Sequence, residues 1–161
     1  MIRAVVDPSV FVSALLGRGD AAPARVHAAL ANGRFQAVVS PTLIGELEDV
    51  LARPKFADAT SGRVAAFVAG IAAQAQSHHD VATRHRTRDP RDDYLVSLAV
   101  DAQVDVIVSL DGDLLDERGP IEVLTPAAFL ARVGRAAAVL PRAGARIRGL
   151  VVPPRRLRAR A

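Results

Sequence analysis

The chain of 161 residues contains no cysteine, no tryptophan and only one lysine, Lys55. Without cysteine it cannot form disulfide bonds, zinc–thiolate sites or a thiol nucleophile. This composition is compatible with a reducing, cytoplasmic environment, where we expect the protein to work. No apolar run approaches the roughly 18 residues of a membrane helix, and the N-terminal segment lacks the pattern of a signal peptide. We therefore expect no membrane association.

Aromatic residues are also scarce, at 4% of the chain, although 50% of all residues are hydrophobic. The apolar residues are mostly Ala, Val and Leu, which suits a core of helices packed on a sheet with small residues at close contacts. The length and the hydrophobic content are sufficient for one domain with a sizeable core and a short appendage.

Acidic residues are absent from the last part of the chain, after Glu122. Residues 1–140 hold 14 basic and 17 acidic residues, a net charge of −3, whereas residues 141–161 hold seven arginines and no acid. A mildly acidic body with a basic tail indicates an anionic partner, with nucleic acid as the first candidate. The charge run alone leaves open the alternative of a solvated tail.

Short apolar segments alternate with amphipathic segments along the chain. We expect strands at 2–6, 35–39, 79–81, 104–109 and 121–124. We expect helices at 10–16, 23–31, 41–51, 61–76, 92–102 and 126–135, with Ser9 capping the first. This alternation is typical of an α/β fold with a central parallel sheet. The pattern is lost after residue 135, so we expect a domain at 1–135 and a basic, Arg- and Pro-rich tail at 136–161.

Acidic residues follow two of the expected strands and stand near the start of two expected helices. Asp7 follows the first strand and Asp111 the strand at 104–109, while Asp92 begins a helix and Glu46 lies in the first turns of another. In an open parallel sheet, ligands bind beyond the carboxyl ends of the strands, and this topology lets all four acids reach that end. Converging carboxylates repel one another, and a hard cation such as Mg²⁺ or Mn²⁺ relieves the repulsion. The arrangement favours metal-assisted hydrolysis of a phosphodiester.

Each acid also has a structural explanation that spacing alone leaves open. Glu46 can be a solvated helix residue, Asp92 a helix cap and Asp111 a turn residue. Asp7 is harder to explain in this way, because it stands between an apolar strand and an apolar helix.

Four segments together resemble the PIN domain, in particular the branch that includes toxins of toxin–antitoxin systems. The similarity extends from residue 2 to about residue 135. The segments are Val5–Leu16 with Asp7, Ser40–Leu47 with Glu46, Asp89–Ala99 with Asp92, and Val106–Leu115 with Asp111. One such segment is weak evidence, whereas four in this order and spacing are fairly specific.

The resemblance implies a three-layer α/β/α sandwich with a quartet of acids that is both catalytic and metal-binding. The quartet is Asp7, Glu46, Asp92 and Asp111. Beside it, Asp93 and Asp113 are expected as further metal ligands, and Ser109 matches a small hydroxyl residue near the site. The resemblance also implies dependence on Mg²⁺ or Mn²⁺, cleavage of RNA, frequent homodimers and a small antitoxin protein as partner.

Position 9 departs from the family pattern. After the first Asp the family usually has a hydroxyl residue followed by Asn, where this chain has Pro8 and Ser9. A single hydroxyl there replaces a carbonyl and an NH₂ group, which weakens the positioning of metal or substrate. The alternative function is therefore a PIN module that binds RNA or a protein partner with little or no catalysis.

A basic loop stands directly before Asp92. Its arginines are Arg84, Arg86, Arg88 and Arg91. We expect them to bind RNA phosphates close to the metal, although a solvated loop explains the same charges.

Two further features are expected to be structural. His78 and His79 beside Asp80 suggest a softer metal site, but no further histidine stands at ligand spacing. Tyr94 is the only tyrosine, and we expect it to pack in the core or at its edge.

Two other enzyme classes also place an aspartate after the first strand, namely haloacid-dehalogenase-like phosphatases and receiver domains. Both normally need a lysine late in the sheet, whereas Lys55 follows a helix in an Arg-Pro-Lys break. The phosphatase motif would also have an aspartate at position 9, which is Ser9. Both classes are therefore disfavoured.

Overall fold

The structure is a computed structural model that describes residues 1–56, 62–85 and 87–139. The strands are β1 (Arg3–Val6), β2 (Gln36–Val39), β3 (Gln76–Ser77), β4 (Val106–Val108) and β5 (Glu122–Leu124). The helices are α1 (Pro8–Leu16), α2 (Ala22–Ala31), α3 (Pro41–Leu51), the short 3₁₀ helix η1 (Pro54–Phe56), α5 (Val64–Gln74), α6 (Asp93–Asp101), α7 (Gly112–Asp116) and α8 (Pro126–Val139). Helices therefore separate consecutive strands, as the alternating sequence pattern predicts.

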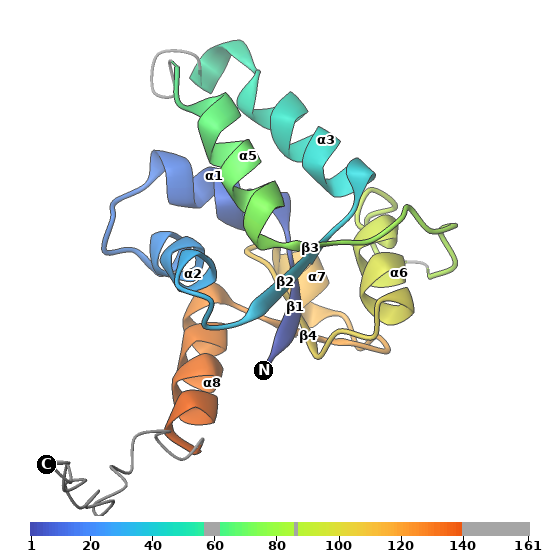
Figure 1. The fold of residues 1–161 in the computed structure, drawn as a ribbon. Helices are drawn as coiled ribbons and strands as arrows, with labels where there is room; N and C mark the ends of the chain where they lie inside the picture. Colours follow the sequence, from blue (N-terminus) through green and yellow to red (C-terminus); the bar gives the residue numbers. More distant parts are fainter. Residues whose placement is uncertain (57–61, 86, 140–161) are drawn as a thin grey trace, which may run out of the picture.

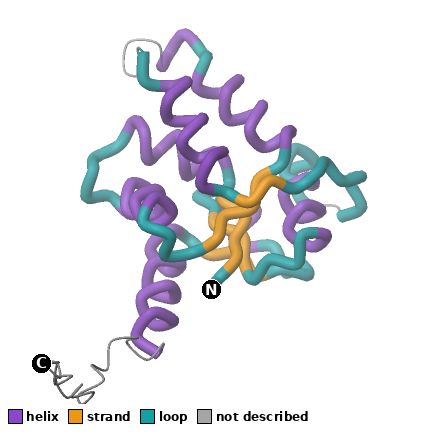
Figure 2. The backbone as a smooth tube through the Cα atoms, in the orientation of Figure 1, coloured by secondary structure: helices purple, strands orange, loops and turns teal. Residues whose placement is uncertain are grey.

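The strands form one sheet in the order β3-β2-β1-β4-β5. Every pairing in it is parallel, and the strands lie together in the middle of the molecule (Figure 2). All carboxyl ends therefore lie at one edge of the sheet. The order reverses at β1, which pairs with β2 on one side and β4 on the other. A crevice is expected at such a reversal.

Helices cover both faces of the sheet. Helices α1, α2, α3, α5 and α8 pack on one another, whereas α6 contacts β1 and β4. Figure 1 shows α6 on the opposite side of the sheet from α1, α2 and α5. The expected α/β/α sandwich with a central parallel sheet is therefore confirmed. Among the described residues, no helix is both long and apolar enough to span a membrane.

The apolar strands are buried because they have helices on both sides. The residues of β4 are fully shielded from solvent, as are Ala4 and Val5 of β1. Phe35 and Phe129 meet edge to face, with ring centroids 4.9 Å apart, and join the start of β2 to α8. This core holds the carboxyl ends of β1 and β4 in fixed positions.

The connection from β1 to α1 differs from the expected one. The Asp7 carboxylate accepts a 2.7 Å hydrogen bond from the backbone N–H of Ser9, which makes Asp7 the N-cap of α1. The prediction that Ser9 caps this helix is wrong. The helix already begins at Pro8, because the first helical position tolerates the missing proline N–H.

The third strand also lies elsewhere than predicted. A strand at 79–81 is wrong, because the chain joins the sheet at Gln76 and Ser77, directly after α5. Both residues are exposed at the edge of the sheet. An edge strand of two polar residues has no hydrophobic alternation to reveal it.

At the C-terminal end, α8 continues past the expected end at Arg135 to Val139. The division into a domain at 1–135 and a tail at 136–161 stays a prediction. Arg86 and the seven arginines of residues 141–161 lie outside the described residues.

Candidate active site

The carboxyl ends of β1 and β4 open onto a surface depression of about 380 Å³. Its charged lining residues are Asp7, Glu46, Arg53, Asp89, Arg91, Asp92 and Asp111. The structure thus brings together the four acids of the predicted quartet, which come from four different segments of the chain. Their catalytic and metal-binding roles stay predictions.

Asp7 is the buried member of the quartet, with only 7% of its surface exposed. Its backbone N–H donates to the carbonyl of Val108 at 2.9 Å, so the ladder between β1 and β4 holds it in place. One carboxylate oxygen caps α1, and the other, Oδ2, accepts a hydrogen bond from the hydroxyl of Ser109. Both oxygens of Asp7 therefore have fixed directions.

Ser109 links two of the acids. Its hydroxyl is fully buried. The same oxygen that donates to Asp7 accepts a 3.0 Å hydrogen bond from the backbone N–H of Asp111. Since a hydroxyl both donates and accepts, one side chain aligns the ends of β1 and β4. This contact supports the expected place of Ser109 beside the site.

Asp111 serves partly as a cap. Its Oδ1 accepts hydrogen bonds from the backbone N–H groups of Asp113 at 2.8 Å and Leu114 at 3.2 Å. It is therefore the N-cap of α7, a short helix that the sequence pattern did not predict. Asp111 can cap the helix and also face the depression, because capping uses one carboxylate oxygen and leaves the other. The structural role expected from the sequence is therefore compatible with a place in the site.

Asp92 stands at the N-cap position of α6, but its side chain accepts no capping hydrogen bond. Its carboxylate is instead partly buried among other acids. Burial, together with the charges of Asp7, Asp111, Asp89 and Glu46, raises the pKa of Asp92 to about 6. A carboxylate in this environment is costly to ionise, and a bound cation would remove that cost.

Glu46 is exposed and is held by a residue that sequence analysis did not assign to the site. The phenol of Tyr94 donates a 2.5 Å hydrogen bond to Glu46 Oε2, while its ring packs against the core. Burial and the hydrogen bond to Glu46 raise the pKa of Tyr94 well above its usual range. The expectation of edge packing is correct for the ring, but the hydroxyl faces an acid of the quartet. A buried tyrosine hydroxyl generally needs a hydrogen-bond partner. From the sequence this rule predicts that Tyr94 has a partner, but it does not identify the partner as Glu46.

The sequence of residues 3–113 matches the family model described as PIN domain. The chain belongs to the PIN domain family. PIN domains are generally nucleases that use divalent metal ions, and the acidic depression of this chain is consistent with that class of hydrolase. No curated protein matches the sequence.

A solved structure has a similar fold. The structure of PAE2754 from Pyrobaculum aerophilum is similar, with a TM-score of 0.52 and 15% sequence identity. The match covers 83% of this chain and 90% of that one. At this identity the likeness shows the fold alone.

Two acids expected in this PIN site do not line the depression. Asp93 is 2% exposed, and its Oδ1 accepts hydrogen bonds from the backbone N–H of Thr87 at 2.6 Å and from its hydroxyl at 2.9 Å. Asp113 instead pairs with Arg88 at 2.7 Å. Asp93 thereby anchors the loop before α6, and Asp113 holds the arginine of that loop. Their roles as metal ligands stay predictions.

The arginines of the basic loop have different surroundings in this PIN domain. Arg88 pairs with Asp113, and Arg91 pairs with Asp89 at 2.5 Å. The backbone N–H of Arg84 donates to Ser97 Oγ at 3.1 Å. Arg53, at the end of α3, also lines the depression, and sequence analysis missed it because it appeared only as part of a helix-ending Arg-Pro pair.

Position 9 leaves an unsatisfied polar atom beside the quartet. Ser9 lines the depression, and its Oγ is buried without a hydrogen-bond partner among the described residues. Buried hydroxyls normally have a partner. A ligand or a water in the depression would supply one, so the site accommodates a further group next to Asp7.

Replacing Tyr94 by Phe should weaken Mn²⁺ binding by about three- to tenfold, the net value of one ordinary hydrogen bond, because Glu46 is exposed. The ring stays in place, so the melting temperature of the metal-free protein should change little. Titration calorimetry with Mn²⁺ and a thermal melt separate the two effects. Unchanged affinity would show that Tyr94 does not position Glu46 for the metal.

Proposed function

We propose that this protein is a divalent-metal-dependent endoribonuclease that hydrolyses RNA phosphodiester bonds. The observation that carries the proposal is the convergence of Asp7, Glu46, Asp92 and Asp111 in one depression, where burial and the neighbouring acids raise the pKa of Asp92. Such a concentration of negative charge is unfavourable for the protein alone. It is favourable for a site that binds a cation and a phosphate group.

The residues present fit Mg²⁺ or Mn²⁺. The side-chain donors around the depression are carboxylate and hydroxyl oxygens, which hard cations prefer. Asp7, Asp92, Asp111 and Glu46 would hold the ion. When bound, a divalent cation polarises the phosphate and lowers the pKa of a water.

Other side chains would position the metal ligands and the attacking water. Ser109 fixes the relative positions of Asp7 and Asp111, so the ligands are preorganised. Glu46 is held through Oε2 by Tyr94, which leaves Oε1 to orient the attacking water and to accept its proton. This assignment follows from the exposure of Glu46 at the rim, where water and substrate enter.

RNA would approach over the basic loop that precedes Asp92. We propose Arg84, Arg86, Arg88 and Arg91 as phosphate contacts, and the arginines of residues 141–161 as further contacts. Arg88 and Arg91 would exchange their present carboxylate partners for phosphates. Both arginines are exposed, and exposed ion pairs contribute little free energy. Breaking these ion pairs to bind phosphate would therefore cost little stability.

We further propose that the protein is the toxin of a toxin–antitoxin pair in the cytoplasm, with a small antitoxin protein as partner and a homodimer as its form in solution. These proposals rest on the resemblance of the four acidic segments. A small antitoxin-like reading frame next to the gene would support them, and its absence would count against them.

The cleavage of single-stranded RNA by the purified full chain tests the proposed reaction. We expect cleavage in Mg²⁺ or Mn²⁺, none in a chelator, and loss of both cleavage and metal-dependent thermal stabilisation in Asp7→Asn. Metal binding without cleavage would favour the non-catalytic PIN module, for which the serine at position 9 is the supporting observation. No metal-dependent shift at millimolar Mn²⁺ would refute the metal site.

Ser9→Asn should increase the rate of RNA cleavage. The substitution restores the residue that the family usually has there, and an asparagine carbonyl and NH₂ offer more contacts than the unpartnered hydroxyl. We expect a several-fold gain with an unchanged circular dichroism spectrum. Single-turnover cleavage measures it, and a rate equal to or below the wild-type rate would show that position 9 does not limit activity.

A further inference from the structure

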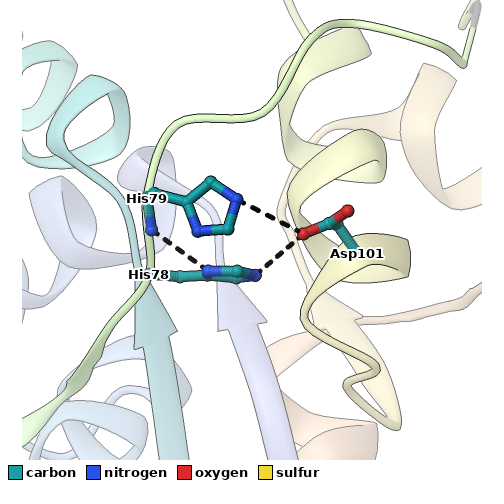
Figure 3. Close-up of side chains that lie close together, drawn as sticks. All are labelled: His78, His79 and Asp101. Carbon is teal, nitrogen blue, oxygen red and sulfur yellow. Dashed lines mark hydrogen bonds and ion pairs between the residues drawn. The ribbon is translucent and has the colours of Figure 1, made fainter.

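A cluster of side chains of the types that ligate metals lies away from the acidic depression. His78 and His79 follow β3, and the fold brings them to Asp101, the last residue of α6 (Figure 3). One ring nitrogen from each histidine and one oxygen of Asp101 lie within 4.8 Å of one another. Sequence analysis placed Asp80 beside the two histidines and found no further histidine at ligand spacing. In the structure Asp80 instead accepts a hydrogen bond from the backbone N–H of Thr42, and the third member of the cluster is Asp101, which is far from the histidines along the chain.

The distances suit a small cation. His78 Nε2 lies 3.1 Å from Asp101 Oδ2, and His79 Nε2 lies 3.8 Å from the same oxygen. Ligands bonded to Zn²⁺ at about 2.0–2.1 Å in a tetrahedral site are about 3.4 Å apart. These two separations lie on either side of this value, and all three ligand atoms lie within 4.8 Å of one another, so small side-chain rotations would complete the site.

We propose that His78, His79 and Asp101 form a separate site for a transition-metal ion such as Zn²⁺, Co²⁺ or Ni²⁺. Imidazole nitrogens prefer these ions, whereas the all-oxygen quartet prefers Mg²⁺ or Mn²⁺. The protein would therefore bind two chemically different ions at two places. This site does not depend on the proposed ribonuclease activity.

The surroundings leave room for a fourth ligand. His79 and Asp101 line an open cavity of about 270 Å³. The His79 and Asp101 side chains are 72% and 46% exposed, whereas that of His78 is only 20% exposed. His78 thus supplies a fixed ligand, the other two face solvent, and water from the cavity can complete a four-coordinate shell.

Metal binding requires a change of proton position on His78. The backbone N–H of His79 donates to His78 Nδ1 at 3.1 Å, which leaves the proton of the neutral ring on Nε2, next to Asp101. An ion at Nε2 would require the ring proton to move to Nδ1, at the expense of that hydrogen bond. This loss lowers the affinity by about five- to tenfold. Two of the three ligands are also exposed and must be ordered when the ion binds, so we expect micromolar affinity.

A bound ion would fasten the edge strand to α6. The sheet ladder ends where His78 N–H donates to the carbonyl of Val39 at 2.8 Å. At its other end α6 carries Tyr94 and follows Asp92. The transition metal would thus stabilise the helix on which part of the acidic site stands.

Titration of the full chain, free of any histidine tag, with Zn²⁺ or Co²⁺ tests this proposal. Asp92→Asn protein in excess Mg²⁺ removes the contribution of the acidic depression. We expect binding of one equivalent with micromolar affinity, a rise in melting temperature of several degrees, and visible absorption bands for Co²⁺. Either His79→Ala or Asp101→Asn, both at exposed positions, should abolish all three signals.

Matched controls exist in the same chain. His85→Ala removes a histidine that lines the same cavity but lies outside the cluster, and Asp116→Asn removes the terminal acid of α7. Both should bind as the parent does. No binding by the parent, or binding that survives His79→Ala and Asp101→Asn, would overturn the proposal. Loss of binding with His85→Ala would assign the ion to the cavity instead of the cluster.

Discussion

Replacing Asp92 by Asn should abolish RNA cleavage and raise the melting temperature of the metal-free protein at pH 7.5. Cleavage should fall by at least about 100-fold, because even residues that only support metal ligands are worth 10- to 100-fold. The stability should rise because the substitution removes an ionised carboxylate from a partly buried group of acids. A residue that is needed for activity can lower the stability of the fold, so its replacement is expected to reduce activity and to increase stability.

The pH dependence of this stability effect follows from the pKa of Asp92, which burial and the neighbouring acids raise to about 6 in the folded chain from its ordinary value of 3.8 in the unfolded chain. Between these values the folded state binds more protons, so the free energy of unfolding falls as the pH rises through this window. The shift corresponds to about 3 kcal/mol, which solvent screening of a partly exposed group reduces to roughly 1 kcal/mol. Asp92→Asn should therefore gain about 3 °C at pH 7.5 and almost nothing at pH 4.

Thermal melts in a chelator at both pH values measure this difference. Asp20→Asn is the control, since Asp20 is an exposed acid whose ion pair with Arg18 is also exposed. It should leave the melting temperature unchanged at both pH values. A lower melting temperature for Asp92→Asn at pH 7.5 would mean that the carboxylate stabilises the fold and is not strained by its neighbours.

Ser109→Ala should weaken both Mn²⁺ binding and cleavage by about 10- to 100-fold. The hydroxyl donates to Asp7 and accepts from the backbone of Asp111, so its removal frees two acids that it now aligns. The metal-free protein should also lose about 1–3 kcal/mol, because Asp7 Oδ2 keeps its burial and loses its donor.

Ser40→Ala is a matched control for this variant. Ser40 is also a buried serine, 3% exposed, and its hydroxyl caps α3 by accepting from the N–H of Leu43. Its loss should cost about 1 kcal/mol while Mn²⁺ affinity stays at the wild-type value. Equal effects of the two substitutions on metal affinity would show that Ser109 acts through stability alone.

The site was partly predictable from the sequence. An aspartate that closely follows a buried strand lies near the carboxyl edge of a parallel sheet, so the positions of Asp7 and Asp111 follow from local pattern and topology. The place of Asp92 required the additional knowledge that α6 packs across β1 and β4. That packing depends on contacts between segments that are distant in sequence, and the hydrophobic periodicity of a single segment does not reveal such contacts.

The direction of individual side chains was less predictable. The adjacent aspartates Asp92 and Asp93 have the same chemistry, yet Asp92 lines the depression and Asp93 is buried against Thr87. Successive residues on a helix point about 100° apart. The rotation of α6 about its axis therefore decides which of the two aspartates faces the depression. This rotation is set by the apolar face of α6, which packs against the core.

The sequence by itself determined the alternation of strands and helices and the order of the acids, because hydrophobic periodicity and capping act over a few residues. Only the tertiary structure decided that Tyr94 meets Glu46, 48 positions away, and that Ser109 meets Asp7, 102 positions away. It also decided that Asp101 completes a cluster with His78 and His79. These contacts form between side chains that packing brings together, and their geometry depends on the whole core.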